Sequence, residues 1–264
     1  MKTVLSALKS WLTKQWVRLV IKKEQLFTQK KITSNVVKKI LIVRLDEIGD
    51  MVLTTPFLRE LRRNYPKAEI TLVVKPAVYN LVELCPYVDK IKKFTKANGR
   101  WAVFQNINLA KKFAYNQLEQ DYDLAIVPRF DSDLDYMAGA IAFYTGASRR
   151  IGYATWVLPR KSKSDAGLEG FYTDFVPARE GVCHEVERNL DILRYLGCSI
   201  ENSSLELWID EHDEQVAKKL LPTRRELRLL VLVLSAGAKH KEWPIENYIG
   251  MVDFFDRKIY YPYY

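Results

Sequence analysis

Short apolar runs alternate with helical patterns over most of the chain, beginning at residue 40. Residues 40–43 form an apolar, largely β-branched run without strict alternation, as expected for a strand buried on both faces of a parallel sheet. Residues 69–74 and 122–127 predict two further strands, and helical patterns separate the strands. This order is typical of βαβ units, so the sequence predicts an α/β fold with a parallel sheet.

The other elements follow from the same periodicities. They are helices at 51–63, 78–84, 105–119, 132–145, 184–196 and 212–221, a peripheral strand at 89–94, an extended segment at 149–153 and an edge strand at 205–209. Gly197 is a C-cap signal for the helix before it. Residues 154–181 show no clear period and predict a long loop, which in a compact domain is more often functional than idle.

A second strand–loop–helix unit begins with the apolar run 227–234 and continues into a helix from Ile245. Like the first unit, it has the form of the start of a Rossmann-like domain. Only residues 235–264 follow the run, too few to complete a doubly wound domain. We therefore expect a Rossmann-like domain at 39–221 and part of a second one at 222–264.

The N-terminal residues 3–21 have helical periodicity and predict a basic amphipathic helix within 1–27. One face carries Leu5, Leu8, Leu12, Trp16 and Leu19, with Val4 and Trp11 at its edge, and Lys2, Lys9, Lys14 and Arg18 lie off that face. Two alternatives stay open. The helix lies in the headgroup region of an anionic membrane, where each basic residue contributes about 1 kcal/mol, or it packs its apolar face on the folded body. Residues 28–38 predict a linker.

Charge and cysteine content narrow the function classes. The net charge of the 264 residues is +9, and residues 1–39 hold ten basic residues against one acid, so residues 40–264 are neutral overall. A folded domain without net positive charge argues against a nucleic-acid partner. The three cysteines have no CxxC spacing, which suggests neither a disulfide framework nor a zinc site. No apolar run approaches the ~20 residues of a membrane span, and no secretory signal is evident, so we expect a cytoplasmic protein.

Acidic residues follow the first predicted strand directly. Asp46, Glu47 and Asp50 lie in this loop, and Gly49 is placed where a backbone turn or a close ligand needs no side chain. Ligands of open α/β sheets bind where such strands end, so an acid here is a candidate catalytic base. The alternative for Asp50 is the N-cap of the helix 51–63.

Four motifs in chain order carry a family resemblance. They are the stretch 44–56 (Arg-Leu-Asp-Glu-Ile-Gly-Asp-Met-Val-Leu-Thr-Thr-Pro), Arg150-Ile-Gly-Tyr153, His184 at its helix start, and the stretch 235–244 (Ser-Ala-Gly-Ala-Lys-His-Lys-Glu-Trp-Pro). Together they resemble glycosyltransferase family 9, the ADP-heptose:lipopolysaccharide heptosyltransferases and their relatives, over about 40–258. The resemblance implies the two-domain GT-B fold, with an acceptor-binding domain at 39–221 and a nucleotide-sugar-binding domain from 222.

The resemblance also implies site residues. An inverting sugar transfer needs one base for the acceptor hydroxyl and one cationic or dipolar clamp for the departing diphosphate. Asp50 matches the family's catalytic aspartate, and Lys241 matches its lysine before the Trp-Pro pair. Backbone N–H groups of Ser235, Ala236 and Gly237 would face the donor phosphates. The donor implied is ADP-heptose or another nucleotide sugar, and the family needs no metal or other cofactor.

Further candidates have plain structural alternatives. Asp46 and the arginines Arg59, Arg62 and Arg63 are candidate acceptor contacts, but a solvated loop acid and a solvated cluster near a helix C-terminus are the alternatives. Asp131-Ser-Asp133 has the spacing of a metal-binding DxD, yet it opens a predicted helix, and capping is the better interpretation. His184 is expected to open its helix rather than to act as a base.

One departure from the family pattern limits the functional prediction. The family's Asp-Thr-Gly motif, which contacts the donor, does not occur in this sequence. We therefore expect an intact acceptor domain, an incomplete donor site, and doubtful transfer by this chain alone. The first hypothesis is an inverting glycosyltransferase that acts on lipopolysaccharide core or another lipid-linked glycan, peripheral on the inner face of the inner membrane. The alternative is a non-catalytic, membrane-associated binding or scaffold module derived from the family.

Overall fold

The computed structural model of the chain describes residues 2–25, 36–97, 102–133, 137–165, 167, 169–181, 183–220, 231–236 and 239–259. The chain divides into two compact units, Met1–Asp210 and Glu211–Tyr264. These units meet at 210–211, and the domain boundary at 221–222 stays a prediction. Most of the predicted linker 28–38 lies outside the described residues.

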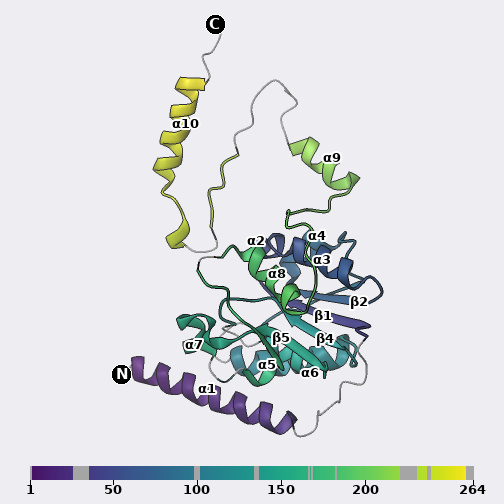
Figure 1. Cartoon of the computed structure of the whole chain (residues 1–264). Coiled ribbons are helices and arrows are strands. Elements are labelled where there is room, and N and C mark those ends of the chain that lie inside the picture. Colours follow the sequence, from purple (N-terminus) through teal and green to yellow (C-terminus); the bar gives the residue numbers. More distant parts are fainter. Residues whose placement is uncertain are drawn as a thin grey trace. The chain divides into compact units, whose positions relative to one another are not determined.

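The first unit is built on a parallel sheet with strand order β3-β2-β1-β4-β5-β6 (Figure 1). The strands are β1 (Lys39–Arg44), β2 (Glu69–Val74), β3 (Lys90–Lys93), β4 (Leu124–Val127), β5 (Arg149–Tyr153) and β6 (Asp174–Val176). This is the doubly wound order, in which the chain reverses direction between β1 and β4 and leaves a crevice at their carboxyl ends. The predicted α/β class and parallel sheet are confirmed.

Helices cover both faces of this sheet, because the central strand is apolar on both sides. Leu41 and Val43 of β1 point into the core shared with α5 (Ala102–Gln117) and α6 (Met137–Tyr144). Ile40 and Ile42 point into the opposite core. That core is covered by α2 (Ile48–Val52), α3 (Thr55–Asn64), η1 (Pro76–Val78), α4 (Tyr79–Val82) and α8 (Glu185–Tyr195).

The predicted helix 51–63 is broken into α2 and α3. The break falls at Leu53 and Thr54, because Pro56 sits in the first turn of α3 and lacks the N–H that a continuous helix would use. The Thr54 hydroxyl donates to the Asp50 carbonyl at 2.7 Å and closes α2. The break leaves α2 as a short helix directly after β1.

Two further predictions need correction. The predicted loop 154–181 contains η2 (Thr155–Val157), α7 (Pro159–Asp165), η3 (Glu169–Phe171) and β6. An apolar period is missing from α7 because its inward residues, Lys161 and Asp165, are polar and buried. Residues 205–209 have no strand conformation: Glu206 pairs with Arg59 at 3.1 Å and Trp208 packs against the core, while Leu205, Leu207 and Ile209 are exposed.

Helix α1 (Lys2–Gln25) packs on the body, along the layer of α5 and α6 (Figure 1). Its buried residues are Val17 and Ile21, whereas Leu12 and Leu19 of the predicted apolar face are 52% and 66% exposed. Packing on the body is therefore confirmed, but of the predicted apolar face Trp16 packs against the core while Leu12 and Leu19 do not. None of the described helices combines the length and the hydropathy that a bilayer span requires.

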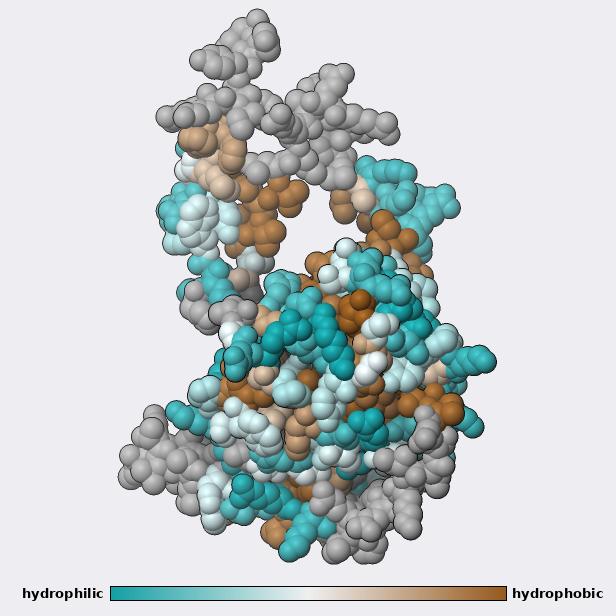
Figure 2. All heavy atoms as spheres, in the orientation of Figure 1, coloured by the Kyte–Doolittle hydropathy of each residue, from teal (hydrophilic) through white to brown (hydrophobic). Residues whose placement is uncertain are grey.

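The second unit contains α9 (Glu211–Leu220), η4 (Lys239–Lys241) and α10 (Ile245–Ile259). No residue of α9 is buried, and Figure 2 shows apolar side chains at the surface of this unit. The part of the predicted strand 227–234 within the described residues, 231–234, has no strand conformation. A partial nucleotide-sugar-binding domain at 222–264 stays a prediction.

Glu60 of α3 is a buried carboxylate that ties this helix to the segment before residue 210. It is 1% exposed and accepts hydrogen bonds from the backbone N–H groups of Glu201 at 3.0 Å and Asn202 at 3.3 Å, and it pairs with Arg63 at 2.9 Å. Burial alone would raise the Glu60 pKa, but these bonds hold it below its ordinary value.

We predict that Glu60→Gln lowers the free energy of unfolding by about 2–4 kcal/mol at neutral pH, because it removes one partner of a buried charge network. The lowered pKa means that the wild-type contribution is present above the ordinary glutamate pKa and is lost as the pH falls below about 4. Urea unfolding at neutral pH and at a pH below about 4 measures the loss of unfolding free energy. Glu83→Gln, which changes an exposed glutamate, is the control. An equal effect of both variants would contradict the prediction.

Candidate functional site

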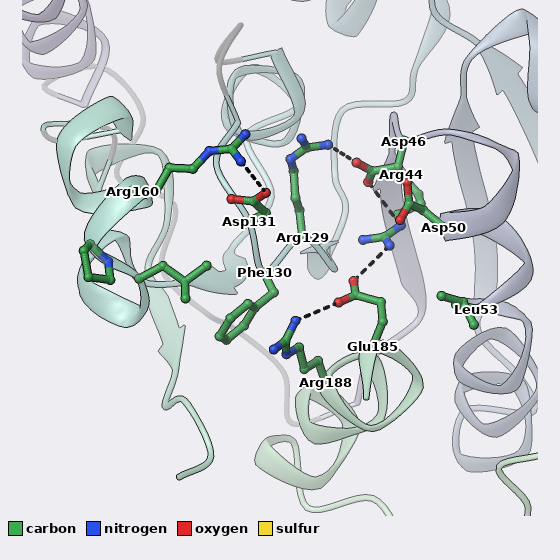
Figure 3. A pocket seen from close by; sticks show the side chains of 12 residues that line it. Arg44, Asp46, Asp50, Leu53, Arg129, Phe130, Asp131, Arg160, Glu185 and Arg188 are labelled. Carbon is green, nitrogen blue, oxygen red and sulfur yellow. Dashed lines mark hydrogen bonds and ion pairs between the residues drawn. The ribbon is translucent and has the colours of Figure 1, made fainter. Parts of the chain in front are cut away.

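A pocket of about 540 Å³ opens at the carboxyl ends of β1 and β4, at the reversal point of the sheet (Figure 3). Five parts of the chain build it: the residues after β1, α2, the residues after β4, the start of α7 and the start of α8. Its lining consists of Arg44, Asp46, Asp50, Leu53, Arg129, Phe130, Asp131, Leu158, Pro159, Arg160, Glu185 and Arg188. The crevice at the strand ends, predicted as the place of a site, is thus a real cavity.

Arg44 holds three of these parts together. Its side chain is 2% exposed, and its guanidinium lies 3.2 Å from Glu185 of α8 and 3.1 Å from Asp46. It also donates to the carbonyl of Pro128 after β4. Burial lowers the Arg44 pKa, which the carboxylates of Glu185 and Asp50 oppose. The buried cation therefore aligns the ends of β1 and β4 with the first turn of α8.

Asp46, a predicted acceptor contact, lines the pocket between two arginines. One of its oxygens faces Arg44, and the other pairs with Arg129 (Figure 3). Arg129 also donates to the carbonyl of Ser132 at 2.8 Å. Asp46 is 9% exposed, so its carboxylate serves mainly to orient the two arginines in the pocket wall.

Asp50, the predicted base, lies at the junction of two cavities. It lines the 540 Å³ pocket and a neighbouring one of about 240 Å³ that extends toward Lys75 and Met137. Glu47, not Asp50, is the N-cap of the first helix after β1, and Asp50 is the third helical residue. Its Oδ2 accepts from the Glu47 N–H at 3.3 Å, a long bond that leaves Oδ1 outside the capping box. The predicted N-cap alternative is therefore wrong: Asp50 takes part in the capping box as the third helical residue and also lies at the pocket.

An aromatic and cationic stack forms the wall on the α8 side. The Arg188 guanidinium lies 4.0 Å from the centre of the Phe130 ring and 3.4 Å from Glu185. Phe130 in turn meets Tyr153 edge-on at 4.9 Å, and the Tyr153 hydroxyl donates to the Arg188 carbonyl at 2.5 Å. Stacking fixes the orientation of the Arg188 guanidinium toward the cavity.

Sequence reasoning missed the residues after β4 and at the start of α8. The signal for Arg129 and Phe130 was the same as for Asp50: they directly follow a core strand. Glu185 and Arg188 share a helix face by their spacing of three, in the first turns of α8. Nothing in the sequence joins these segments, because the contacts with Arg44 span more than eighty residues.

Lys161 of α7 binds the backbone of the pocket residues that follow β4. Its ammonium is buried and donates to the carbonyls of Arg129 at 3.1 Å and Phe130 at 3.2 Å. Burial lowers the Lys161 pKa to about 8, against the opposing charges of Asp165 and Asp133. Asp133 also caps the start of α6, accepting from the Ala138 N–H at 3.1 Å, so its predicted capping role is confirmed.

Other predicted residues lie elsewhere. Arg59, Arg62 and Arg63 are absent from the pocket lining, and each pairs with a carboxylate of the first unit: Glu206, Asp89 and Glu201, respectively. The His184 ring accepts from the Val186 N–H at 3.3 Å, which confirms that it opens α8.

The predicted donor contacts belong to the second unit. Ser235, Ala236 and Lys241 are exposed there, and Gly237 lies outside the described residues. Their donor-binding role stays a prediction.

Known proteins similar to this chain are glycosyltransferases. No protein-family model matches the sequence. A Haemophilus influenzae protein named "Putative glycosyltransferase" is 25% identical over 152 residues, which cover 53% of this chain and 40% of that protein. A glycosyltransferase family 9 structure from Veillonella parvula matches with a TM-score of 0.60 at 20% identity and covers 86% of this chain and 62% of the other.

Two heptosyltransferase structures from E. coli agree with this fold. ADP-heptose lps heptosyltransferase II matches with a TM-score of 0.58 at 16% identity over 83% of this chain and 62% of that chain. Heptosyltransferase WaaC with ADP-2-deoxy-2-fluoro heptose matches with a TM-score of 0.54 at 17% identity over 82% and 65%. The predicted GT-B type of fold is thus confirmed. The chain spans less than two thirds of each of these relatives.

We predict that Lys161 makes stability depend on alkaline pH. Because its folded pKa is lowered to about 8, the unfolded chain binds more protons between about pH 8 and 10, and stability rises with pH across that window. At 1.36 kcal/mol per unit, the gain reaches at most about 3 kcal/mol.

The measurement is urea unfolding of wild type and Lys161→Met at pH 7.5 and 10. From the lower to the higher pH, the unfolding free energy of wild type should rise relative to that of Lys161→Met. Lys163→Met changes an exposed lysine of the same helix and serves as the control. A wild-type-to-variant difference that does not move with pH would refute a buried ammonium.

Proposed function

We propose that this chain belongs to an inverting glycosyltransferase that moves a heptose-like sugar from a nucleotide-sugar donor to a hydroxyl of a lipid-linked glycan such as lipopolysaccharide core. The observation that carries the proposal is the position of Asp50. Its carboxylate lines a 540 Å³ pocket at the sheet reversal point, in a fold that matches family 9 glycosyltransferases. An acid there can meet an acceptor hydroxyl held in the cavity.

The chemistry assigns Asp50 the role of general base. The acceptor oxygen forms a bond with the anomeric carbon while the bond from that carbon to the diphosphate breaks, and the hydroxyl proton passes to the Asp50 carboxylate. Inversion follows because the acceptor attacks the face opposite the leaving group. The helix-capping bond to Glu47 uses Oδ2, so Oδ1 is the oxygen we assign to the proton.

The pocket suits a polar, multiply hydroxylated acceptor. Four arginines and four acids line it, and Leu53, Phe130, Leu158 and Pro159 add apolar surface. Arg160 is 68% exposed at the rim and 3.7 Å from Asp131, so it can exchange this pair for an acidic group of the acceptor. Arg44 and Asp46 position these groups rather than contact the sugar.

The donor is a nucleoside diphosphate sugar, and ADP-heptose is our first candidate because a structural neighbour carries a fluorinated ADP-heptose. Lys241 and the backbone of 235–237 remain the proposed phosphate contacts on the second unit. We place the reaction at the inner face of the cytoplasmic membrane, where lipid-linked acceptors are held.

Asp50→Asn tests the proposed base. The amide keeps an oxygen that accepts from the Glu47 N–H but cannot take a proton, so we expect release of ADP from ADP-heptose, in the presence of a lipopolysaccharide-core acceptor, to fall by about 10²–10⁴-fold. Thermal unfolding and acceptor binding should stay as in wild type.

Asp131→Asn is the matched control, since it neutralises another acid of the pocket that is 51% exposed. It should retain most of the activity. If wild type releases ADP and Asp50→Asn releases it at the same rate, Asp50 is not the base. If wild type binds the acceptor but shows neither ADP-heptose binding nor ADP release, the chain is the non-catalytic binding module instead.

A further inference from the structure

Helix α1 is apolar on two sides, and the body covers only one of them. Val17 and Ile21, four residues apart, are buried in the core beside α5 and α6. Leu12 and Leu19, seven residues apart, share another side and are 52% and 66% exposed, and Trp11 is 56% exposed. With 3.6 residues per turn, Leu19 lies about 160° from Val17 around the helix. We call Trp11, Leu12 and Leu19 the outer face.

Basic side chains border the outer face. Arg18 and Lys22 are exposed, and no acidic residue occurs between Trp11 and Lys22. Across residues 1–39 the chain carries ten basic residues and one acid, which together supply its whole net charge of +9. An apolar row with a tryptophan and flanking cations is the composition of helices that lie in a bilayer interface.

We propose that the outer face of α1 docks the chain on a bilayer surface that contains anionic lipid. Leu12 and Leu19 would enter the boundary between headgroups and acyl chains, and Trp11 would sit at headgroup level. Lys22 would lie against lipid phosphates. The charge favours this occupant over a second copy of the chain, because pairing two outer faces would bring like charges together.

The same helix braces the wall of the pocket. The Lys14 ammonium donates to the carbonyl of Lys163 in α7, and Gly167 packs against the Arg18 side chain with φ +97°. Figure 1 shows α7 beside α1, and α7 contributes Arg160 to the pocket lining. Docking of α1 therefore brings this wall of the pocket toward the bilayer. That this position would bring the pocket near a lipid-linked acceptor rests on the proposed function.

The test is co-sedimentation of the purified chain with phosphatidylcholine vesicles, with and without phosphatidylglycerol. Wild type should bind the anionic vesicles, and binding should weaken as salt rises, since added salt screens exposed charges. Leu12→Gln/Leu19→Gln should weaken binding at least tenfold with unchanged thermal unfolding, because both side chains are exposed. The control Leu205→Gln/Leu207→Gln changes two other exposed leucines and should bind as wild type does.

Three results would overturn the proposal. They are no binding of wild type to anionic vesicles at low salt, equal binding by the outer-face variant, and a wild-type dimer that the outer-face variant dissociates in sedimentation velocity. The vesicles contain neither sugar acceptor nor donor, so vesicle binding does not depend on transfer. If vesicle binding fails while Asp50 still controls ADP release, the docking inference falls and the proposed function stands. The reverse outcome would leave membrane docking intact without the enzyme.

Discussion

The pocket depends on one buried cation, Arg44. A guanidinium that is almost fully removed from water costs several kcal/mol unless it is paired. Here Arg44 donates hydrogen bonds to Glu185 and to the Pro128 carbonyl, and the Asp46 carboxylate forms an ion pair with its Nε at 3.1 Å. Those partners come from the ends of β1 and β4 and from α8. The electrostatic need of one side chain thus joins three segments distant in sequence. Because Asp46 also pairs with Arg129, the same charge network continues along the pocket wall.

The position of Asp50 follows from this frame and from the break after α2. The amide of Asn189, a buried residue of α8, donates to the Leu53 carbonyl at 3.0 Å, a group that a continuous helix would have satisfied internally. Helix α8, whose first turn pairs with Arg44, therefore also stabilises the break between α2 and α3. An unbroken helix from residue 48 to 64 would change the direction of α3 and the packing of Leu53 at the pocket edge.

Sequence reasoning located β1 to β5 and the loop that carries Asp50, because each has a local signature: an apolar or extended run, or an acid after it. β6 fell in a predicted loop, and the reversal point depends on the strand order, which no local pattern specifies. Sequence reasoning also did not locate α7 or the role of Arg129. The inward side of α7 includes Lys161, whose buried ammonium donates hydrogen bonds to two carbonyls after β4 and lies near the charges of Asp165 and Asp133. Because the buried residues of α7 are polar, no hydrophobic period in the sequence marks this helix. The arginines of α3 have the spacing of a site, but each pairs with a carboxylate of the first unit outside the pocket lining, and their role in acceptor binding stays a prediction.

Helix α1 shows a different limit of periodicity. The sequence contains two overlapping apolar rows, one through Leu12 and Leu19 and one through Val17 and Ile21. Burial is decided by the surface that the helix meets, and β-branched side chains at a spacing of four fit the layer of α5 and α6. The leucine row is therefore the one left outside. A helix that needed only to pack on the body would not require it, so the exposed leucines call for a second apolar medium rather than a better fit to the first.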